Sequence, residues 1–228
     1  MDGNNRWARR EGLFGVAGHR AGAEVVRDIV SACESREIRY LTLFVFSSEN
    51  WGRPLPEVRG LLALLSRYLR SEVAKLVADG VRLRVIGRRD RFSAGLQKLI
   101  AKAETQTQAG DRAVLTLALD YGGRWDVTDV VQSIAHDVAS GQIAPEEISE
   151  EMISQRLSTS DLPDPDLCIR TAGEARMSNF LLWQLAYAEF WFTEVLWPDF
   201  DETVLDLALA AYAVRERRFG VRPLLHRY

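Results

Sequence analysis

The pattern of apolar and polar positions predicts strands that alternate with helices along the chain. Four short apolar runs fit buried strands, at residues 40–46, 81–86, 113–119 and 167–169. The run at 40–46 is nearly continuous, as a parallel sheet covered on both faces requires. Longer segments with apolar positions at helical spacing predict helices at 19–36, 56–79, 93–107, 124–140 and 201–218, and a short helix with a Pro-rich loop within 144–165.

This alternation predicts an α/β fold with a mostly parallel central sheet flanked by helices. The chain has 228 residues, which is enough for one large domain with a sizeable core. No internal repeat or low-complexity linker divides it. We therefore expect a single domain over residues 1–228, with 219–228 as a loose tail.

The first residues have the composition of a loop. Asp2, Gly3 and Asn4 are turn-forming types, and Gly3 permits a positive φ and a close approach of the backbone to a ligand. Since such a loop usually follows a strand, we expect a further apolar strand ahead of Asp2. The simplest alternative is that Asp2 is a solvated carboxylate near a chain end.

Composition narrows the choice of partners and compartment. The net charge is -3, so no excess of positive charge is available for a nucleic acid backbone, and nucleic acid is excluded as the main partner. Cys33 and Cys168 both lie in apolar settings, which favours free thiols in a reducing cytoplasm. Charged residues interrupt every long apolar run well short of the ~20 residues that a membrane span needs. Membrane contact is therefore expected only as a transient surface contact.

A candidate anion site follows the predicted strand at 167–169. Arg170 ends this strand, a turn follows, and Arg176 and Ser178 come next, with Ser178 at the expected N-cap of a helix. Two arginines, a hydroxyl and a helix N-terminus suit an anion with several oxygens, such as diphosphate. The alternative is a pair of surface arginines.

Glu189 stands in an apolar and aromatic segment shortly after this site. A carboxylate close to a diphosphate is repelled unless a cation lies between them, which indicates Mg²⁺. A solvated glutamate is the alternative. The common nucleotide-binding fingerprints, G-x-x-x-x-G-K-[ST] and G-x-G-x-x-G, are absent from the sequence.

Five blocks of the sequence closely resemble the cis-prenyltransferases, and in particular the bacterial undecaprenyl diphosphate synthases. They cover nearly the whole chain in the right order: MDGNNRWA at 1–8, GHRAG at 18–22, LTLFVFSSENWGRP at 41–54, DYGGRWD at 120–126, and the stretch at 166–200 that contains the arginine site. The resemblance implies a parallel sheet flanked by helices, an apolar tunnel and a homodimer.

The resemblance also implies roles for individual residues. Asp2 and Asn50 match catalytic positions, and Asp2 and Glu189 match the ligands of Mg²⁺. Positions for the allylic diphosphate are matched by Gly3, Asn4, Arg6, Trp7, Arg9, Arg10 and His19. The loop that positions the reacting ends is matched by Ser47, Ser48, Trp51 and Arg53. Arg170, Arg176 and Ser178 match the site for isopentenyl diphosphate.

The function that this likeness implies is chain elongation. Isopentenyl diphosphate would be condensed onto an allylic diphosphate, expected to be farnesyl diphosphate, to give a long polyprenyl diphosphate such as undecaprenyl diphosphate, the lipid carrier precursor for cell-wall synthesis. Two alternatives stay open, a short-chain synthase and a non-catalytic partner subunit.

Two departures from the family pattern bear on substrate binding and on product length, respectively. Ala175 replaces the histidine that relatives often carry in the phosphate loop, and Val45 replaces an alanine at a tunnel-side position. Ala113 is small and would leave the far end of the tunnel open. Since valine is only slightly larger than alanine, we expect the tunnel to stay passable and the product to be long.

Overall fold

The computed structural model describes residues 1–14 and 16–216. Its elements, in chain order, are α1 (Asn4–Arg10), α2 (Ala17–Ser35), β1 (Tyr40–Ser47), the 3₁₀ turn η1 (Ser48–Gly52), α3 (Leu55–Ala78), β2 (Val81–Ile86), α4 (Ala94–Thr107), β3 (Ala113–Tyr121), α5 (Gly123–Ala139), η2 (Pro145–Glu147), α6 (Glu150–Ser154), β4 (Leu167–Arg170), β5 (Glu189–Phe192), η3 (Trp197–Asp199) and α7 (Glu202–Ala213).

The strands are parallel, as predicted, but they form two sheets. β3 is the central strand of the first sheet, and β1 and β2 pair with it on either side. β4 and β5 make the second sheet. Because the strands of each sheet run the same way, the turns that follow β1, β2 and β3 meet at one edge.

β1 and β4 are edge strands whose unpaired sides both line one large cavity. An edge strand presents free backbone N–H and C=O groups. The strand expected ahead of Asp2 stays a prediction.

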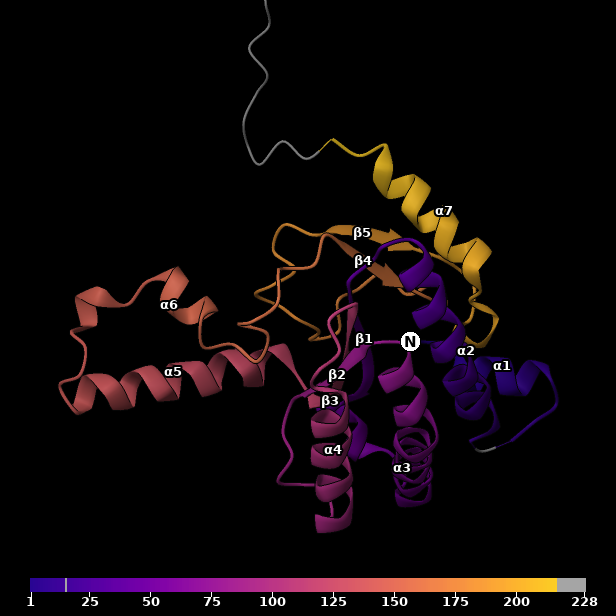
Figure 1. The fold of residues 1–228 in the computed structure, drawn as a ribbon, viewed down its shortest axis with the longest axis horizontal. Coiled ribbons are helices and arrows are strands. Elements are labelled where there is room, and N and C mark those ends of the chain that lie inside the picture. The colour runs from indigo at the N-terminus through magenta and orange to yellow at the C-terminus, as the bar shows by residue number, and fades with distance from the viewer. Residues whose placement is uncertain (15, 217–228) are drawn as a thin grey trace, which may run out of the picture.

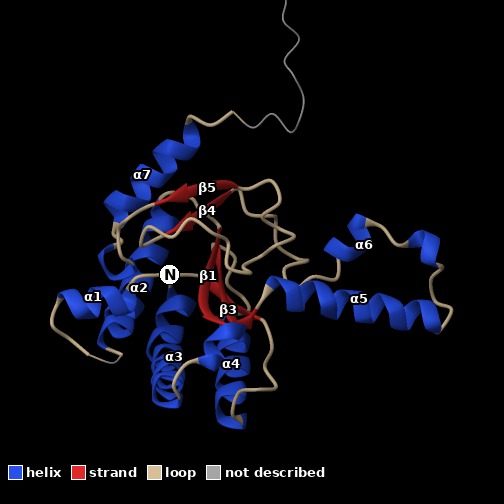
Figure 2. Cartoon of the chain, turned by 180° about the vertical axis from the view of Figure 1, so that it is seen from behind, coloured by secondary structure: helices blue, strands red, loops and turns tan. Residues whose placement is uncertain are grey.

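Helices cover one face of the three-stranded sheet. α2, α3 and α4 pack their apolar stripes against β1, β2 and β3 in the main core, which also includes side chains from η3 and α7. Figure 2 shows the same arrangement from behind, with α7 over the second sheet. The other face is covered by the turns of residues 177–188, where Phe180 stacks on Phe44 of β1 with ring centroids 4.6 Å apart.

α5 and α6 form an arm that extends away from the two sheets (Figure 1). They have a small core of their own, centred on Val130, Ile134 and Leu157. Val131 on α5 is half exposed, with 52% of its surface accessible. In the described part of the chain, no helix is long and apolar enough to cross a membrane.

Two expectations from the sequence need correction, and a third lies outside the described residues. Ser178 does not cap a helix, because the segment that follows it is a series of turns. Ser178, Asn179 and Leu181 all have a left-handed backbone, with φ of 47°, 64° and 40°, which a continuing α-helix excludes. The last helix, predicted for 201–218, ends at Ala213. The predicted loose tail, 219–228, lies outside the described residues.

Candidate active site

A cavity of about 1170 Å³ lies between β1 and β4. Polar side chains gather where these two strands end, and they include Asp2, Asn50, Arg170 and Arg176. Apolar side chains of α2, α3 and α7 line much of the remainder, among them Val26, Ile29, Leu61, Leu65 and Leu205. The cavity therefore offers charged groups beside a large apolar space.

Asp2 is fixed at the carboxyl end of β4 by its backbone. Its N–H donates to the Thr171 hydroxyl at 2.9 Å, and that hydroxyl donates to the Asp2 carbonyl at 2.9 Å. The backbone N–H of Trp197 donates to the same carbonyl at 2.9 Å. Gly3 then turns the chain with φ 104°, as predicted, but the group it approaches closely is Leu196, which a Cβ would meet at 2.9 Å.

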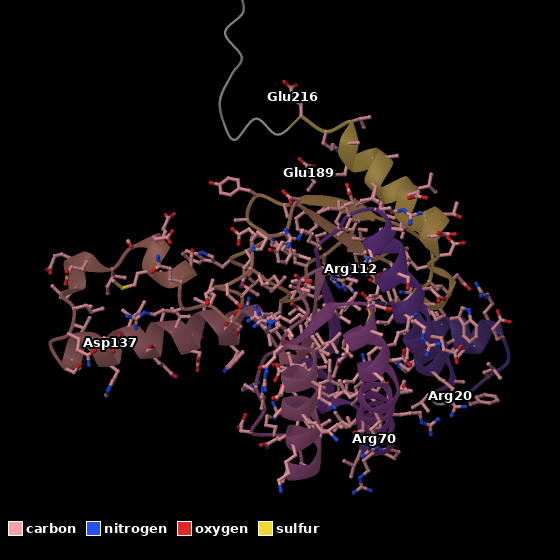
Figure 3. All side chains as sticks on the ribbon, viewed as in Figure 1. Arg20, Arg70, Arg112, Asp137, Glu189 and Glu216 are labelled. Atoms are coloured by element: carbon pink, nitrogen blue, oxygen red, sulfur yellow. The ribbon has the colours of Figure 1, made fainter. Side chains whose placement is uncertain are left out.

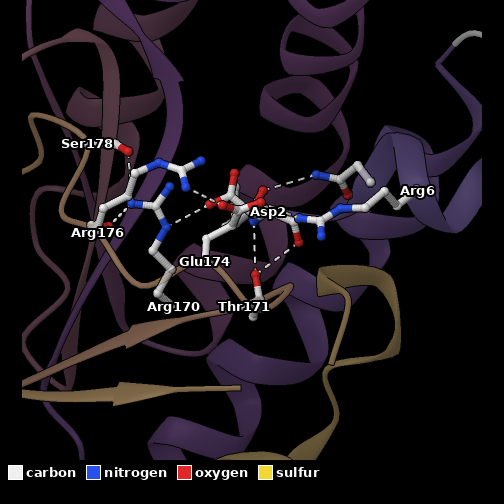
Figure 4. Close-up of polar contacts among 9 residues, drawn as sticks. Asp2, Arg6, Arg170, Thr171, Glu174, Arg176 and Ser178 are labelled. Carbon is white, nitrogen blue, oxygen red and sulfur yellow. Dashed lines mark hydrogen bonds and ion pairs between the residues drawn. The ribbon is translucent and has the colours of Figure 1, made fainter. Parts of the chain in front are cut away.

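The predicted isopentenyl diphosphate residues come together beside Asp2 (Figure 4). The Arg170 Nε donates to Asp2 Oδ2 at 3.0 Å, and its Nη1 donates to the Ser178 hydroxyl at 2.9 Å. Arg170 also donates to the Arg176 carbonyl. A short loop thus presents two guanidinium groups and one hydroxyl to the same space, which is the donor set that a diphosphate needs.

Glu174 connects the two predicted substrate sites. Its Oε1 accepts from Arg6 of α1 at 2.8 Å, and its other oxygen pairs with Arg176. Figure 4 shows the Glu174 carboxylate between these two arginines. The carboxylates of Asp2 and Glu174 therefore occupy the places that diphosphate oxygens would take on Arg170, Arg6 and Arg176.

Two residues predicted for the allylic diphosphate bind another carboxylate. Arg10 donates to both oxygens of Asp199, at 2.8 and 2.9 Å, and the Trp7 indole N–H donates to Asp199 at 2.8 Å. The hydrogen bonds from Arg10 lower the pKa of Asp199. Arg9 is exposed in the last turn of α1.

Asn4 and His19 lie where α1 packs on α2. The approach is close, since a Cβ on Gly18 would lie 1.9 Å from the Asn4 carbonyl oxygen. Asn4 Oδ1 and His19 Nε2 are buried without a hydrogen-bond partner. Burial, and then the charge of Arg53, lower the pKa of His19, so its imidazole is neutral at neutral pH. Buried polar atoms without partners are rare in proteins, and here both line the cavity, which favours a ligand at this place.

The turn after β1 has two faces. Ser47, Asn50 and Arg53 line the cavity, and Asn50 Oδ1 accepts from the Ser47 N–H at 3.1 Å. Ser48 and Trp51 are absent from the cavity wall and pack on the opposite side of the turn. The structure therefore separates the residues predicted for this loop into two groups.

The structure does not bring Glu189 to Asp2. Glu189 begins β5 opposite Leu167, whereas Asp2 lies against Arg170 and Thr171 at the other end of β4. The Glu189 carboxylate lies 3.9 Å from Arg215, and Figure 3 shows it near the end of α7. Within the described residues, no group of three or more His, Cys, Asp or Glu side chains could hold a metal ion.

The two residues considered for their effect on product length, Val45 and Ala113, lie in different parts of the structure. Val45 lines the cavity, as expected for a tunnel wall. Ala113, at the start of β3, is partly buried and packs against the main core, and it is not among the residues that line the cavity.

Three site residues were not found from the sequence. Thr171 and Glu174 lie between Arg170 and Arg176, and this position in the sequence is the signal that could have identified them. Asp199 lies far along the chain from α1, and no local pattern connects them.

Known proteins resemble this chain over nearly its full length. A family profile described as "Putative undecaprenyl diphosphate synthase" matches residues 1–220. The ditrans,polycis-undecaprenyl-diphosphate synthase ((2E,6E)-farnesyl-diphosphate specific) of Xanthomonas axonopodis is 52% identical over 97% of this chain and 86% of its own. The enzyme of the same name from Pseudomonas syringae is 50% identical over 96% of this chain and 88% of its own.

Two solved structures share the fold. Lavandulyl diphosphate synthase from Lavandula x intermedia, in complex with dimethylallyl diphosphate, has a TM-score of 0.94 and 39% identity, over 96% of this chain and 95% of its own. A probable undecaprenyl diphosphate synthase from Campylobacter jejuni has a TM-score of 0.78 and 33% identity, over 88% and 92% of the two chains.

Replacing Glu174 by Gln should tighten the binding of inorganic diphosphate. The anion must displace the Glu174 carboxylate from Arg6 and Arg176, and a partly exposed ion pair of this kind is worth about 0.2–1 kcal/mol. The two pairs together correspond to a fall in Kd of about twofold to 30-fold, which isothermal titration calorimetry measures.

The matched control is Glu34→Gln. Glu34 is equally exposed, at 26% against 24% for Glu174, and it pairs with Arg112 at 2.8 Å away from the cavity. Tighter binding in both variants would point to net charge alone, and weaker binding in Glu174→Gln would mean that Glu174 does not compete with the anion.

Proposed function

The chain belongs to the undecaprenyl diphosphate synthase family of cis-prenyltransferases, and on that basis we propose that it elongates farnesyl diphosphate with isopentenyl diphosphate. The product is a long-chain polyprenyl diphosphate, such as the undecaprenyl diphosphate named for its relatives, which serves as the lipid carrier precursor for cell-wall synthesis. The observation that carries the proposal is the cavity that joins the Asp2–Arg170–Arg176 group to an apolar space of about 1170 Å³.

Each substrate has a distinct place in this proposal. The diphosphate of isopentenyl diphosphate binds Arg170, Arg176 and Ser178 at the end of β4. The allylic diphosphate binds Gly3, Asn4, Arg6 and His19 where α1 meets α2, and Trp7 and Arg10 would join it by exchanging Asp199 for the diphosphate. Holding two substrates side by side removes much of the entropic barrier to their reaction.

Magnesium fits Asp2. Mg²⁺ usually binds proteins through one or two carboxylates together with substrate phosphate oxygens and water. Asp2 is partly exposed in the cavity and would hold the ion with the allylic diphosphate. The ion supplies positive charge to the departing diphosphate. Glu189 joins this site only if it moves from Arg215 to the other end of β4.

The chain's own residues then favour bond exchange. Arg6 and Arg176, once released from Glu174, stabilise the negative charge that develops on diphosphate as its carbon–oxygen bond breaks. The allylic carbon separates from its diphosphate oxygen and bonds to the terminal alkene carbon of isopentenyl diphosphate, which places positive charge on the methyl-bearing carbon. A proton then leaves the CH₂ group between that carbon and the diphosphate-bearing carbon, and the cis double bond forms there. Bound diphosphate and a nearby side chain are equally suitable acceptors of that proton.

The assembly and location are part of the proposal. The α5–α6 arm, with its half-exposed Val131, supports a homodimer. Cys33 and Cys168 are free, and burial raises the pKa of Cys33 to about 11, which fits inert thiols in a reducing cytoplasm. Product release would involve a transient contact with a membrane surface.

The proposed reaction should be detected as incorporation of radiolabelled isopentenyl diphosphate into farnesyl diphosphate, dependent on Mg²⁺. Mass analysis of the dephosphorylated product should show a long chain, because Val45 removes little of the cavity. A dominant product of geranylgeranyl length, which is one addition onto farnesyl diphosphate, would instead favour a short-chain synthase, and Val45→Ala should then lengthen it. If no isopentenyl diphosphate is incorporated, the remaining alternative, a non-catalytic partner subunit, would be favoured.

Asp2→Ala should reduce kcat by about 10³-fold with a much smaller change in KM, because stabilising the leaving diphosphate is a transition-state effect. Steady-state incorporation at saturating Mg²⁺ measures both constants. Near-normal turnover would remove Asp2 from the proposed chemistry.

Arg170→Ala and Arg176→Ala should mainly raise the KM for isopentenyl diphosphate. A hydrogen bond to a charged group contributes about 1.5–3 kcal/mol, which corresponds to about a 10-fold to 100-fold increase. Arg112→Ala, which breaks an exposed pair outside the cavity, is the control. An unchanged KM in both variants would place this substrate elsewhere.

A further inference from the structure

The outer face of η1 is held by Asp120, near the end of β3, and by residues that follow β2. The Ser48 hydroxyl donates to the Asp120 carbonyl at 3.2 Å and accepts from Arg88 Nη2 at 3.1 Å. The Arg91 guanidinium lies 4.7 Å from the centroid of the Trp51 ring. Both contacts are on the side of the turn that faces away from the cavity.

Asp120 lies beneath these two arginines. It is fully buried at the end of β3, with a left-handed φ of 46°. Its Oδ1 lies 3.6 Å from Arg88 Nη2 and 3.5 Å from Arg91 Nη1. Both guanidinium groups therefore lie close to one buried carboxylate, and both also contact the turn.

This cluster is unusual in its unpaired polar atoms. Both carboxylate oxygens of Asp120, the Nε of Arg88 and the Nε1 of Trp51 are buried without a hydrogen-bond partner. In the described part of the chain, the other such atoms belong to Asn4 and His19, at the proposed allylic site. Burying a carboxylate with so few hydrogen bonds is costly, so the cluster is a poor way to stabilise the fold alone.

We propose that Asp120 is a positioning residue for prenyl transfer, acting through Arg88 and Arg91 on the turn that presents Ser47 and Asn50 to the substrates. This inference rests on the proposed function of that turn. The carboxylate offsets the repulsion between two guanidinium groups. Arg88 then holds Ser48, and Arg91 holds the Trp51 ring.

The effect should appear in turnover more than in binding. The diphosphate ligands Arg170 and Arg176 follow β4, in the other sheet, and do not contact the cluster. A displaced turn changes how the reacting carbons meet, and small misplacements of this kind reduce rates strongly.

The first test compares Asp120→Asn with the unaltered chain. The substitution keeps the shape of the side chain and removes its charge. We expect kcat to fall by about tenfold, while the KM for isopentenyl diphosphate changes by less than about twofold. Arg91→Gln, a change at a partly exposed side chain, should reduce kcat in the same way and serves if Asp120→Asn does not fold.

A double variant separates positioning from general damage. Because Asp120 acts partly through Arg88, which binds Ser48, the loss of kcat in Asp120→Asn/Arg88→Met should be smaller than the product of the two single losses, whereas independent damage would multiply them. The control is Arg84→Met. Arg84 lies on β2, and this substitution breaks its ion pair with Asp161 without affecting a contact of the turn. It should leave kcat unchanged.

Fluorescence tests the turn without relying on activity. The fluorescence of Trp51 is obtained by subtracting the emission of the Trp51→Phe version of each chain from that of the chain itself. Acrylamide should quench this Trp51 fluorescence more strongly in Asp120→Asn than in the unaltered chain. Unchanged kcat and unchanged quenching in both Asp120→Asn and Arg91→Gln would overturn the positioning role. Absent incorporation by the unaltered chain would overturn the proposed function, and quenching would still decide whether Asp120 positions the turn.

Discussion

The hydrogen bonds between Thr171 and Asp2 are the constraint on which the candidate site depends. One hydroxyl both accepts from the Asp2 N–H and donates to the Asp2 carbonyl, and the Trp197 N–H completes the attachment. These bonds join the first residues of the chain to the end of β4 and to η3. Without them, the Asp2 carboxylate would have no fixed relation to Arg170, and α1 would not carry Arg6 to Glu174.

The charges of the site are balanced internally. Arg170 pairs with Asp2, Arg6 and Arg176 share Glu174, and Arg10 binds Asp199. Clustered arginines repel one another, so carboxylates among them make the cluster possible in the absence of a ligand. In the proposed function, the same carboxylates would compete with a bound diphosphate. The affinity for that anion would then be the difference between two sets of ion pairs, and a single carboxylate such as Glu174 could change it.

Elements with a clear apolar period were predictable from the sequence, and the remaining elements depend on distant contacts. β1 to β4 and α2 to α5 have such periods, and all were found close to their observed bounds. α1 has no apolar stripe, and its buried residues, Asn4 and Ala8, pack on Gly18 of α2. β5 is only four residues long within an aromatic segment. The apolar run after Ser178 fits a helix by its period, but left-handed residues and the stacking of Phe180 on Phe44 hold it as turns.

The candidate site, like the fold, was predictable only where the signal is local in the sequence. The two arginines and Asp2 could be found because strand ends and loop composition are local signals. Sequence could not say which carboxylate each arginine would meet, since Glu174 and Asp199 are chosen by packing across the chain. The role of Asp120 could not be found from the sequence, because it depends on burial of the carboxylate beside two arginines that follow another strand.

The two sheets are connected at the site by side chains. No strand pairing joins β1 to β4 in the described residues. Asn179 crosses between them, donating to Glu49 of η1 at 2.8 Å and accepting from the Arg124 N–H at 2.9 Å. It adjoins Ser178, the hydroxyl that Arg170 binds. The same short loop thus contains Ser178, which Arg170 binds, and Asn179, which contacts the turn that carries Asn50. Side chains of this loop, in place of strand pairing, therefore connect the two walls of the cavity.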